Sequence, residues 1–208
     1  MITTVLFDFG GVFTPSPFAS ARTEGSVLGH DPEVVIEIIF GRYDTDTDHP
    51  WHRLERGEMT LEAARAEIVG IAAAQGIELD PFDALRHMAS KEHDEEPFID
   101  RARRLRSAGY RTGLITNNVA EFRDAWRTMV PVDELFEIVV DSCEVGMRKP
   151  DPRVFHLALE QLGADPHATV FLDDFDGNIR AAEALGMHGI LVGADRHAAV
   201  AELDALLT

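Results

Sequence analysis

The stretch that decides the fold is VLFDFGGVFTPS, residues 5–16, in which an apolar run ends at a carboxylate and two glycines follow. The apolar residues before Asp8 predict a buried β-strand, because a strand covered on both faces is apolar throughout. Gly10 and Gly11 then allow a sharp turn whose backbone N–H groups can point at an anion. We therefore expect Asp8 at the end of a buried strand, beside a candidate anion site.

Composition narrows the class of protein. The 208 residues are 45% hydrophobic and carry a formal net charge of -18, so the chain can bury one core and a small accessory domain. The negative charge argues against nucleic acid and anionic membranes as partners. The sequence has one cysteine, no signal-peptide charge pattern and no apolar run as long as a membrane span. We expect a soluble cytoplasmic protein, either a monomer or a homodimer.

Strand-like runs alternate with helical patterns, an order typical of a parallel sheet with helices on both faces. Strands, all fully buried, are expected at residues 3–9, 111–117, 136–142, 168–174 and 188–193. Helices are expected at residues 97–108, 119–129, 152–162, 177–185 and 196–207. The predicted fold class is α/β, with a Rossmann-like parallel sheet core. Ligands of such sheets bind at the carboxyl ends of the strands.

The interval between the first two predicted strands, about a hundred residues, is far longer than an ordinary crossover connection. It contains helix-start signals at Ser16-Pro17, Asp31-Pro32, Thr60 and Asp80-Pro81. These signals predict a small helical cap domain over residues 16–94, inserted after the first strand into a core of residues 1–15 and 95–208. The acidic segment KEHDEEP, residues 91–97, is the expected hinge.

Polar side chains occupy four places at the carboxyl ends of the strands, and these places converge on a parallel sheet. They are Asp8, then Thr116 with Asn117, then Arg148 with Lys149, and finally Asp173 with Asp174. Each alone has a plain explanation as a turn, a helix cap or a solvated charge. Together, the three aspartates would repel one another without a cation, and their hard oxygen atoms suit Mg²⁺ shared with a substrate phosphate. Lys149 and the Thr116 hydroxyl would then contact the phosphate oxygens.

Four segments resemble, in order, the four motifs of the haloacid dehalogenase superfamily: FDFGGV, LITNN, GMRKPDPRVF and VFLDDFDGNIRAAEALGM. The resemblance spans nearly the whole chain and includes the insertion after the first motif. Within the superfamily, the chain is most similar to bacterial α-D-glucose-1-phosphate phosphatases and to the N-terminal phosphatase domain of soluble epoxide hydrolases. The segment WHRLERGEMTLEA, residues 51–63, shares this similarity. The resemblance implies a Mg²⁺-dependent phosphatase that acts on a small phosphate ester, such as a sugar phosphate.

The motifs also imply a role for each matching residue. Asp8 would be the nucleophile that forms an aspartyl-phosphate. Thr116 would hydrogen-bond a phosphoryl oxygen, and Lys149 would neutralise charge on the nucleophile and on the phosphoryl group. Mg²⁺ would be held by Asp8, the backbone carbonyl of Gly10 and Asp174, with Asp173 in support directly or through water. The expected substrate contacts are Gly10, Gly11, Asn117 and His52.

Two positions depart from the pattern of the superfamily. Asn178 stands where many relatives have a further acid, which weakens one outer contact of the metal site. Gly10 stands where typical phosphatases of the superfamily carry a second Asp as general acid. The natural substrate is therefore expected to have a leaving group that needs little protonation, such as an anomeric sugar phosphate or an acyl phosphate. Otherwise His52 or an ordered water would supply the proton.

Other interpretations of the sequence are weaker or remain open. The segment from Asp44 to Glu55 mimics a calcium-binding loop, but His49 stands where that loop needs glycine. Cys143 has no partner that marks a nucleophile, so it is expected to act as a small hydrophobic residue. A 2-haloacid dehalogenase would have no use for the acidic pair Asp173 and Asp174. A phospho-receiver domain lacks the insertion, and a catalytically weak phospho-ligand-binding relative stays an open alternative.

Overall fold

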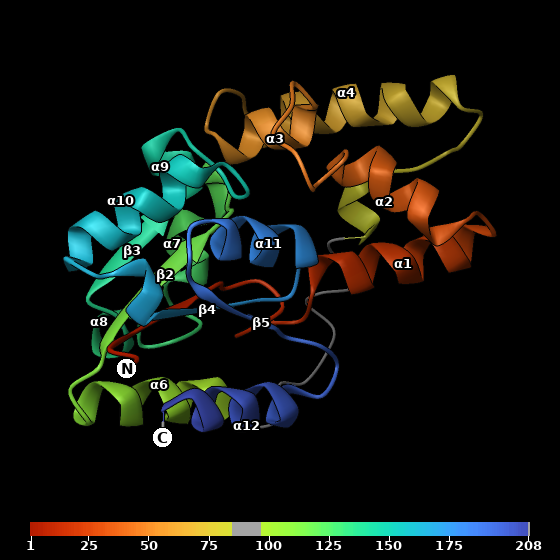
Figure 1. Cartoon of the computed structure of the whole chain (residues 1–208). Coiled ribbons are helices and arrows are strands. Elements are labelled where there is room, and N and C mark those ends of the chain that lie inside the picture. The colour runs from red at the N-terminus through yellow and green to blue at the C-terminus, as the bar shows by residue number, and fades with distance from the viewer. Residues whose placement is uncertain (85–96, 208) are drawn as a thin grey trace.

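The computed structural model describes residues 1–84 and 97–207, which form a five-stranded parallel sheet with helices on both faces (Figure 1). The strands are β1 (Thr4–Phe7), β2 (Arg111–Thr116), β3 (Ile138–Asp141), β4 (Thr169–Asp173) and β5 (His188–Leu191). Their order in the sheet is β3-β2-β1-β4-β5, so β1 is central. Leu6 of β1 is in register with Gly113 of β2 and Phe171 of β4. The predicted α/β class and Rossmann-like sheet are confirmed.

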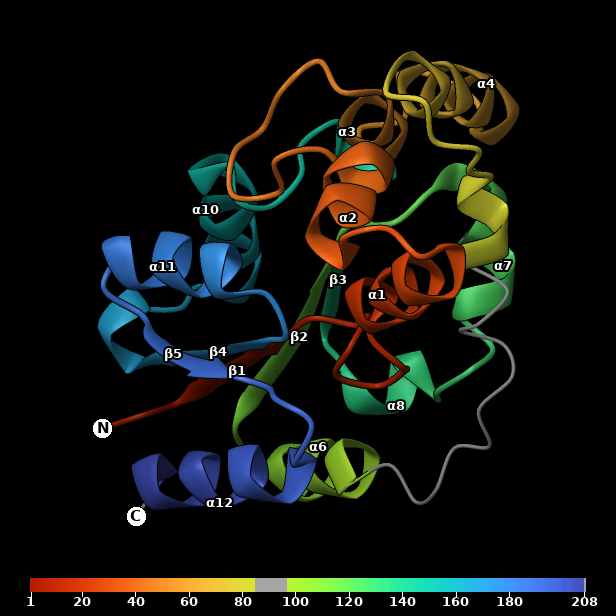
Figure 2. The ribbon, with the colours of Figure 1, turned by 90° about the vertical axis from the view of Figure 1, so that its right-hand side faces the viewer.

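Side chains alternate across the central strand and so divide the core into two layers. Val5 and Phe7 pack in a cluster with α6 (Pro97–Ser107) and α12 (Arg196–Leu207). Leu6, between them, packs on the other side with α10 (Pro152–Leu162) and α11 (Asp176–Ala184). Figure 2 shows the two helix pairs on opposite faces of the sheet. The predicted bounds of α10 and α12 are confirmed.

Four helices follow β1 and lie together beside the sheet in Figure 1: α1 (Pro17–Leu28), α2 (Pro32–Phe40), α3 (Pro50–Glu55) and α4 (Leu61–Ala74). The helix starts predicted at residues 16, 31 and 60 are confirmed, and Asp31 and Thr60 cap their helices through side-chain oxygens. A further helical stretch, residues 81–84, begins at the predicted Pro81. Helix α3 was not predicted from the sequence.

The helical insertion has a hydrophobic cluster of its own, which includes Phe18 of α1, Phe40 of α2 and Ile68 of α4. Its predicted end at residue 94 lies outside the described residues, as does the predicted hinge 91–97 except for Pro97. The division of the chain into a core and a cap domain therefore stays a prediction.

Two details of the sheet and its connections differ from the sequence prediction. Strands β3 and β5 form the edges, and β5 leaves His188 and Leu191 exposed, so neither edge strand is fully buried. The helix predicted at residues 119–129 is split into η1 (Ala120–Phe122) and α7 (Arg123–Trp126). The split has a packing reason. Val119 packs in the hydrophobic cluster of the insertion, whereas Trp126 packs in the cluster that contains Val5 and Phe7 of β1.

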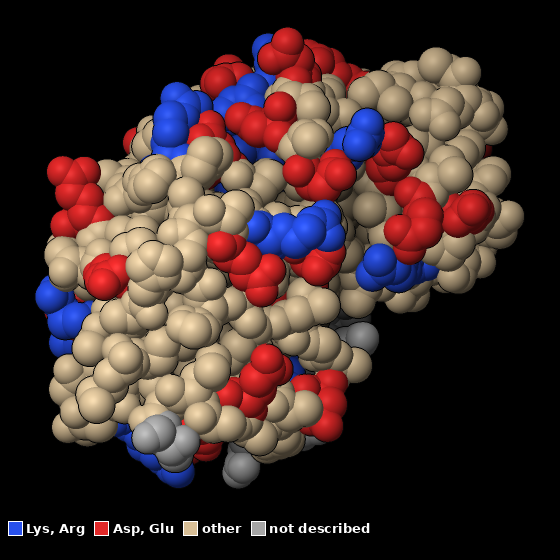
Figure 3. Space-filling view, viewed as in Figure 1, with Lys and Arg blue, Asp and Glu red and all other residues tan. Residues whose placement is uncertain are grey.

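Short helices complete the described parts of the chain, and they are α8 (Val132–Leu135), α9 (Ser142–Val145) and η2 (Pro166–Ala168). Figure 3 shows acidic side chains scattered over this face of the molecule, interspersed with basic ones, rather than gathered into one patch. No helix within residues 1–84 and 97–207 is both long and apolar enough to cross a membrane.

Candidate active site

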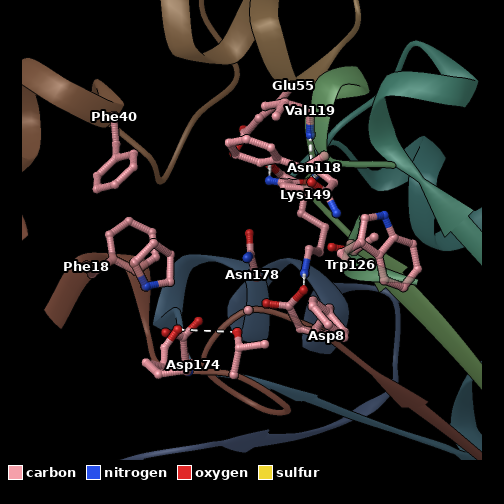
Figure 4. A pocket seen from close by; sticks show the side chains of 18 of the residues that line it. Asp8, Phe18, Phe40, Glu55, Asn118, Val119, Trp126, Lys149, Asp174 and Asn178 are labelled. Carbon is pink, nitrogen blue, oxygen red and sulfur yellow. Dashed lines mark hydrogen bonds and ion pairs between the residues drawn. The ribbon is translucent and has the colours of Figure 1, made fainter. Parts of the chain in front are cut away.

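The parallel sheet brings the predicted strand-end residues together. Asp8 directly follows β1, Thr116 ends β2 and Asp173 ends β4, and β1 lies between the other two strands. Asp8, Thr116 and Asp174 all line one cavity, which is shown in Figure 4. Asp8, Asp173 and Asp174 each offer an oxygen atom, and these three atoms lie within 4.8 Å of one another.

Lys149 provides the positive charge in this acidic cluster. Its Nζ lies 2.6 Å from Asp8 Oδ1 and 2.7 Å from Asp173 Oδ2, and its side chain is buried. Burial opposes the charged ammonium, yet the two carboxylates raise the pKa of Lys149 above its ordinary value. Burial also raises the pKa of Asp8, and Asp173 and Asp174 add to the rise while Lys149 opposes it. The shifts share one cause beyond burial, which is that three carboxylates surround a single ammonium group.

Asp174 is the carboxylate that Lys149 does not contact directly. Burial and the neighbouring Asp173 raise its pKa to about 7. Its Oδ2 is buried and has no hydrogen-bond partner among the described residues. Gly11 packs so closely on this side chain that an added Cβ would overlap it, and Gly11 has a φ of 76°, which favours glycine. An orphaned carboxylate oxygen beside two further carboxylates is a donor set that fits Mg²⁺.

Asp173 is held rigidly from its own side of the sheet. Its Oδ1 accepts from the Phe175 N–H at 2.8 Å, and Asn178 Nδ2 lies 3.1 Å from both of its carboxylate oxygens. Asn178, the residue found in place of a further acid, thus donates to Asp173 instead of adding a fourth negative charge. The amide fixes the plane of the carboxylate that faces Lys149.

The side chain of Asn117, predicted as a substrate contact, makes its hydrogen bonds with other residues of the protein. Its Oδ1 accepts from the Lys149 N–H at 2.8 Å, and its Nδ2 donates to the Lys149 carbonyl and to the Tyr43 hydroxyl, both at 3.0 Å. It also lines the cavity with Thr116 and Gly10. The side chain fixes the backbone of Lys149 at two points, and a direct contact with substrate stays a prediction.

The cavity above the acidic cluster has a volume of about 530 Å³ and is lined mainly by apolar side chains. The insertion contributes Phe18, Phe40, Tyr43, Trp51 and Glu55, and the core contributes Val119, Phe122, Trp126 and Met129. Apart from Trp51 and Glu55, which lie in the segment similar to relatives, no sequence signal pointed to these residues. The acidic cluster forms one end of the cavity and aromatic rings form much of the rest.

Three predicted site residues do not line the cavity: Gly11, which adjoins the acidic cluster, Asp173, which belongs to it, and His52. His52 is fully buried, and its Nδ1 accepts from the Thr47 N–H at 3.0 Å. Burial, followed by the nearby Arg148 charge, lowers the pKa of His52 to about 3, so the imidazole is neutral. Cys143 donates its S–H to Asp141, and burial together with that carboxylate raises the thiol pKa to about 12. Such a thiol is not an activated nucleophile.

Comparison with known proteins gives consistent results. A model of the family described as haloacid dehalogenase-like hydrolase matches residues 2–186. Bifunctional epoxide hydrolase 2 of Rattus norvegicus is 36% identical over 214 residues, which cover 95% of this chain and 37% of that protein. Phosphatase MT3486 of Mycobacterium tuberculosis is 27% identical over 222 residues, which cover 99% of this chain and 95% of that protein. The chain spans 19% to 37% of the length of its first mammalian relatives.

Solved structures agree with the same fold. A predicted HAD-like family hydrolase from Porphyromonas gingivalis superposes with a TM-score of 0.67 at 27% sequence identity, and the match covers 98% of both chains. The match extends over the sheet and the helical insertion alike.

Proposed function

This chain belongs to the haloacid dehalogenase-like hydrolases, and we propose that it is a Mg²⁺-dependent phosphatase that works through an aspartyl-phosphate on Asp8. The observation that carries the proposal is the buried cluster in which Lys149 bridges Asp8 and Asp173 while Asp174 keeps an unpaired oxygen. Three carboxylates with one ammonium leave two negative charges uncompensated, so the cluster suits a divalent cation, without which a phosphate would be repelled.

In the proposed reaction, a carboxylate oxygen of Asp8 attacks the phosphorus of the ester. A bond forms between Asp8 and phosphorus while the bond from phosphorus to the alcohol oxygen breaks, and the alcohol leaves with a proton from solvent. Water then attacks the same phosphorus, which releases inorganic phosphate and restores Asp8. The Lys149 ammonium holds Asp8 in position and balances the negative charge on the phosphoryl oxygens, and Thr116 can donate its hydroxyl proton to one of them.

The cation would be held by Asp8, Asp174 and the Gly10 carbonyl, with Asp173 in support. Mg²⁺, when bound, would supply the positive charge that lets a phosphate approach the carboxylates. The same acidic pair disfavours the alternative of a 2-haloacid dehalogenase, because bare Asp173 and Asp174 carboxylates would repel a carboxylate substrate.

The lining of the cavity favours an apolar organic group on the phosphate ester over a sugar. A sugar hydroxyl that is buried without a partner costs free energy, whereas Phe18, Phe40, Val119 and Trp126 offer mainly apolar contacts. We propose that residues 16–94 form a cap domain on a core of residues 1–15 and 95–208, and that the cap selects the organic group. The proposed setting is the cytoplasm, with free small-molecule phosphates as substrates.

The test is a screen for phosphate release from alkyl, aryl and sugar phosphates, with Mg²⁺ and with EDTA. We expect turnover only with Mg²⁺, and faster turnover of aryl phosphates than of sugar phosphates. The control is Asp8→Asn, which keeps the shape of the side chain and removes the nucleophile. Phosphatase activity that survives in Asp8→Asn would show that no aspartyl-phosphate forms there, and activity unaffected by EDTA would contradict the metal assignment.

A further inference from the structure

A second buried charged pair lies outside the acidic cluster and joins the insertion to the core. Arg148 Nε donates to Glu55 Oε2 at 2.6 Å, and both side chains are nearly inaccessible to solvent, at 0% and 3% exposed. Glu55 ends helix α3 in the insertion, and Arg148 precedes Lys149 in the core. A buried charge is costly unless its partner is present, so each of these residues depends on the other.

A second route leads from Glu55 to Lys149 through hydrogen bonds. Glu55 Oε1 accepts from the Tyr43 hydroxyl at 2.7 Å, and Tyr43 in turn accepts from Asn117 Nδ2 at 3.0 Å. Burial and the Glu55 carboxylate raise the pKa of Tyr43, so its hydroxyl keeps the proton that it donates. Asn117 in turn forms hydrogen bonds with both the backbone N–H and the carbonyl of Lys149, as described above.

The two routes form a closed ring of contacts. Both routes begin at the carboxylate of Glu55. The first runs through Arg148 and the peptide bond to Lys149, and the second runs through Tyr43 and Asn117 to the same residue. The Arg148 guanidinium also lies 4.4 Å from the centre of the Tyr43 ring, which ties the two routes together. Figure 4 shows Glu55 above Lys149, on the side of the cavity away from Asp174.

We propose that Glu55 is a positioning residue, which fixes the backbone of Lys149 from both sides and so makes the placement of the Lys149 ammonium depend on the docking of α3. The inference rests on the proposed function for the role of Lys149 in the reaction. Its basis is geometric, since a displacement of about 1 Å of a group at the reacting centre lowers a rate on the order of 10²-fold. Lys149 meets two carboxylates at once, so it has little freedom to correct a shifted backbone.

The first experiment uses Glu55→Gln, which keeps the size of the side chain and removes the nearer of the two negative charges that face Arg148, the other being Asp46, whose Oδ1 lies 3.6 Å from the guanidinium. Its matched control is Glu58→Gln, which breaks an exposed ion pair with Arg56 nearby in the same segment. Both variants are assayed with acetyl phosphate, which is too small to fill the cavity, and with naphthyl phosphate. Because Lys149 acts on the phosphoryl group common to both substrates, kcat in Glu55→Gln should fall about 10²-fold on each, with KM little changed.

Other outcomes of this assay overturn the inference. A loss of kcat confined to naphthyl phosphate would mean that Glu55 only lines the cavity and contacts the organic group. A loss of activity equal to the fraction of unfolded protein, measured by circular dichroism, would mean that Glu55 only stabilises the fold. If Glu55→Gln does not fold, Tyr43→Phe removes only the hydroxyl of the second route, and it should lower kcat on both substrates to a smaller extent. Wild-type kcat in Tyr43→Phe would then overturn the inference.

A second measurement does not depend on turnover. Amide hydrogen exchange in Glu55→Gln should be faster than in the wild type at residues 50–57 and also at residues 147–151, whereas Glu58→Gln should leave residues 147–151 unchanged. Exchange that rises at residues 50–57 alone would overturn the coupling, whatever the activity. A wild-type protein that hydrolyses no phosphate ester, yet shows the coupled exchange, would refute the proposed function and leave the coupling in place.

Discussion

The substitution Gly10→Asp tests why this site has no second aspartate after Asp8. Gly10 lines the cavity, and a Cβ built on it meets only Pro17 Cδ, at 3.7 Å, which is ordinary contact. The backbone there has no left-handed φ, so a side chain can be attached at this position without backbone strain. A carboxylic acid at this position can donate a proton to the departing oxygen, and such catalysis is worth roughly 10²- to 10⁴-fold in rate. That gain corresponds to about 3 to 5 kcal/mol of the barrier.

The assay compares kcat/KM across phosphate esters whose leaving groups differ in pKa. In the wild type we expect a steep fall as the leaving group becomes more basic, because no positioned acid protonates it. In Gly10→Asp the fall should be shallower, with the largest gain for alkyl phosphates and almost none for acyl phosphates. The control is Gly11→Ala, where the added Cβ overlaps Asp174 and the left-handed backbone costs about 1 to 2 kcal/mol.

The control should lower activity equally on all esters, since it disturbs the proposed metal ligand Asp174 and not proton transfer. A shallow dependence in the wild type would refute the reasoning, because it would require an acid already in place. A uniform loss in Gly10→Asp would also contradict it, because the new carboxyl group would then not reach the leaving oxygen.

The remaining predictions concern the charges of the cluster. Lys149→Met should lower kcat about 10²- to 10³-fold and the free energy of unfolding by about 3 to 5 kcal/mol, measured by urea unfolding at pH 7.5. A wild-type kcat would instead make Lys149 purely structural. Asp174→Asn should abolish the increase in Tm that Mg²⁺ gives the wild type, and an unchanged increase would exclude Asp174 as a ligand. In EDTA, the free energy of unfolding of the wild type minus that of Asp174→Asn should fall as pH rises from about 4 to 7. The reason is that the pKa of Asp174 rises from an ordinary 3.8 to about 7 on folding, so the folded wild type binds the extra proton, whereas the opposite contribution of the neutral His52 cancels in the difference. Urea unfolding of both proteins between pH 4 and 8 checks this, and a difference that rises over this range would count against the cluster as described.

The sheet and its acidic end could be predicted from the sequence because local patterns determine them. Each strand is a short apolar run, and a parallel sheet places every strand end at the same edge, so Asp8, Thr116 and Asp173 converge without further information. The segment at residues 119–129 could not be predicted in the same way. Its apolar residues suit a single helix, yet Val119 and Trp126 pack into different clusters.

The part of the site formed by the insertion was predicted less well, because it depends on how α3 is rotated. Trp51 and Glu55 are four residues apart, lie on one face of the helix and line the cavity. His52, adjacent to Trp51, is turned away by about 100° and is buried against Thr47 instead. The sequence offers His52 as the more reactive side chain, but the packing of the insertion, which no local pattern encodes, decides which face meets the cavity.

The charges of the site link the proposed metal to the insertion in a protein with a net charge of -18. Lys149 is the one cationic side chain among the described residues of the lining, and two carboxylates already share its charge. A phosphate that approaches this cluster is repelled unless another cation balances Asp174. Aromatic side chains from the insertion give this site an apolar surrounding, and a low local dielectric constant would strengthen that attraction once the cation is present. The acidic cluster and the apolar cavity therefore depend on each other, and Glu55 and Arg148 hold the two together.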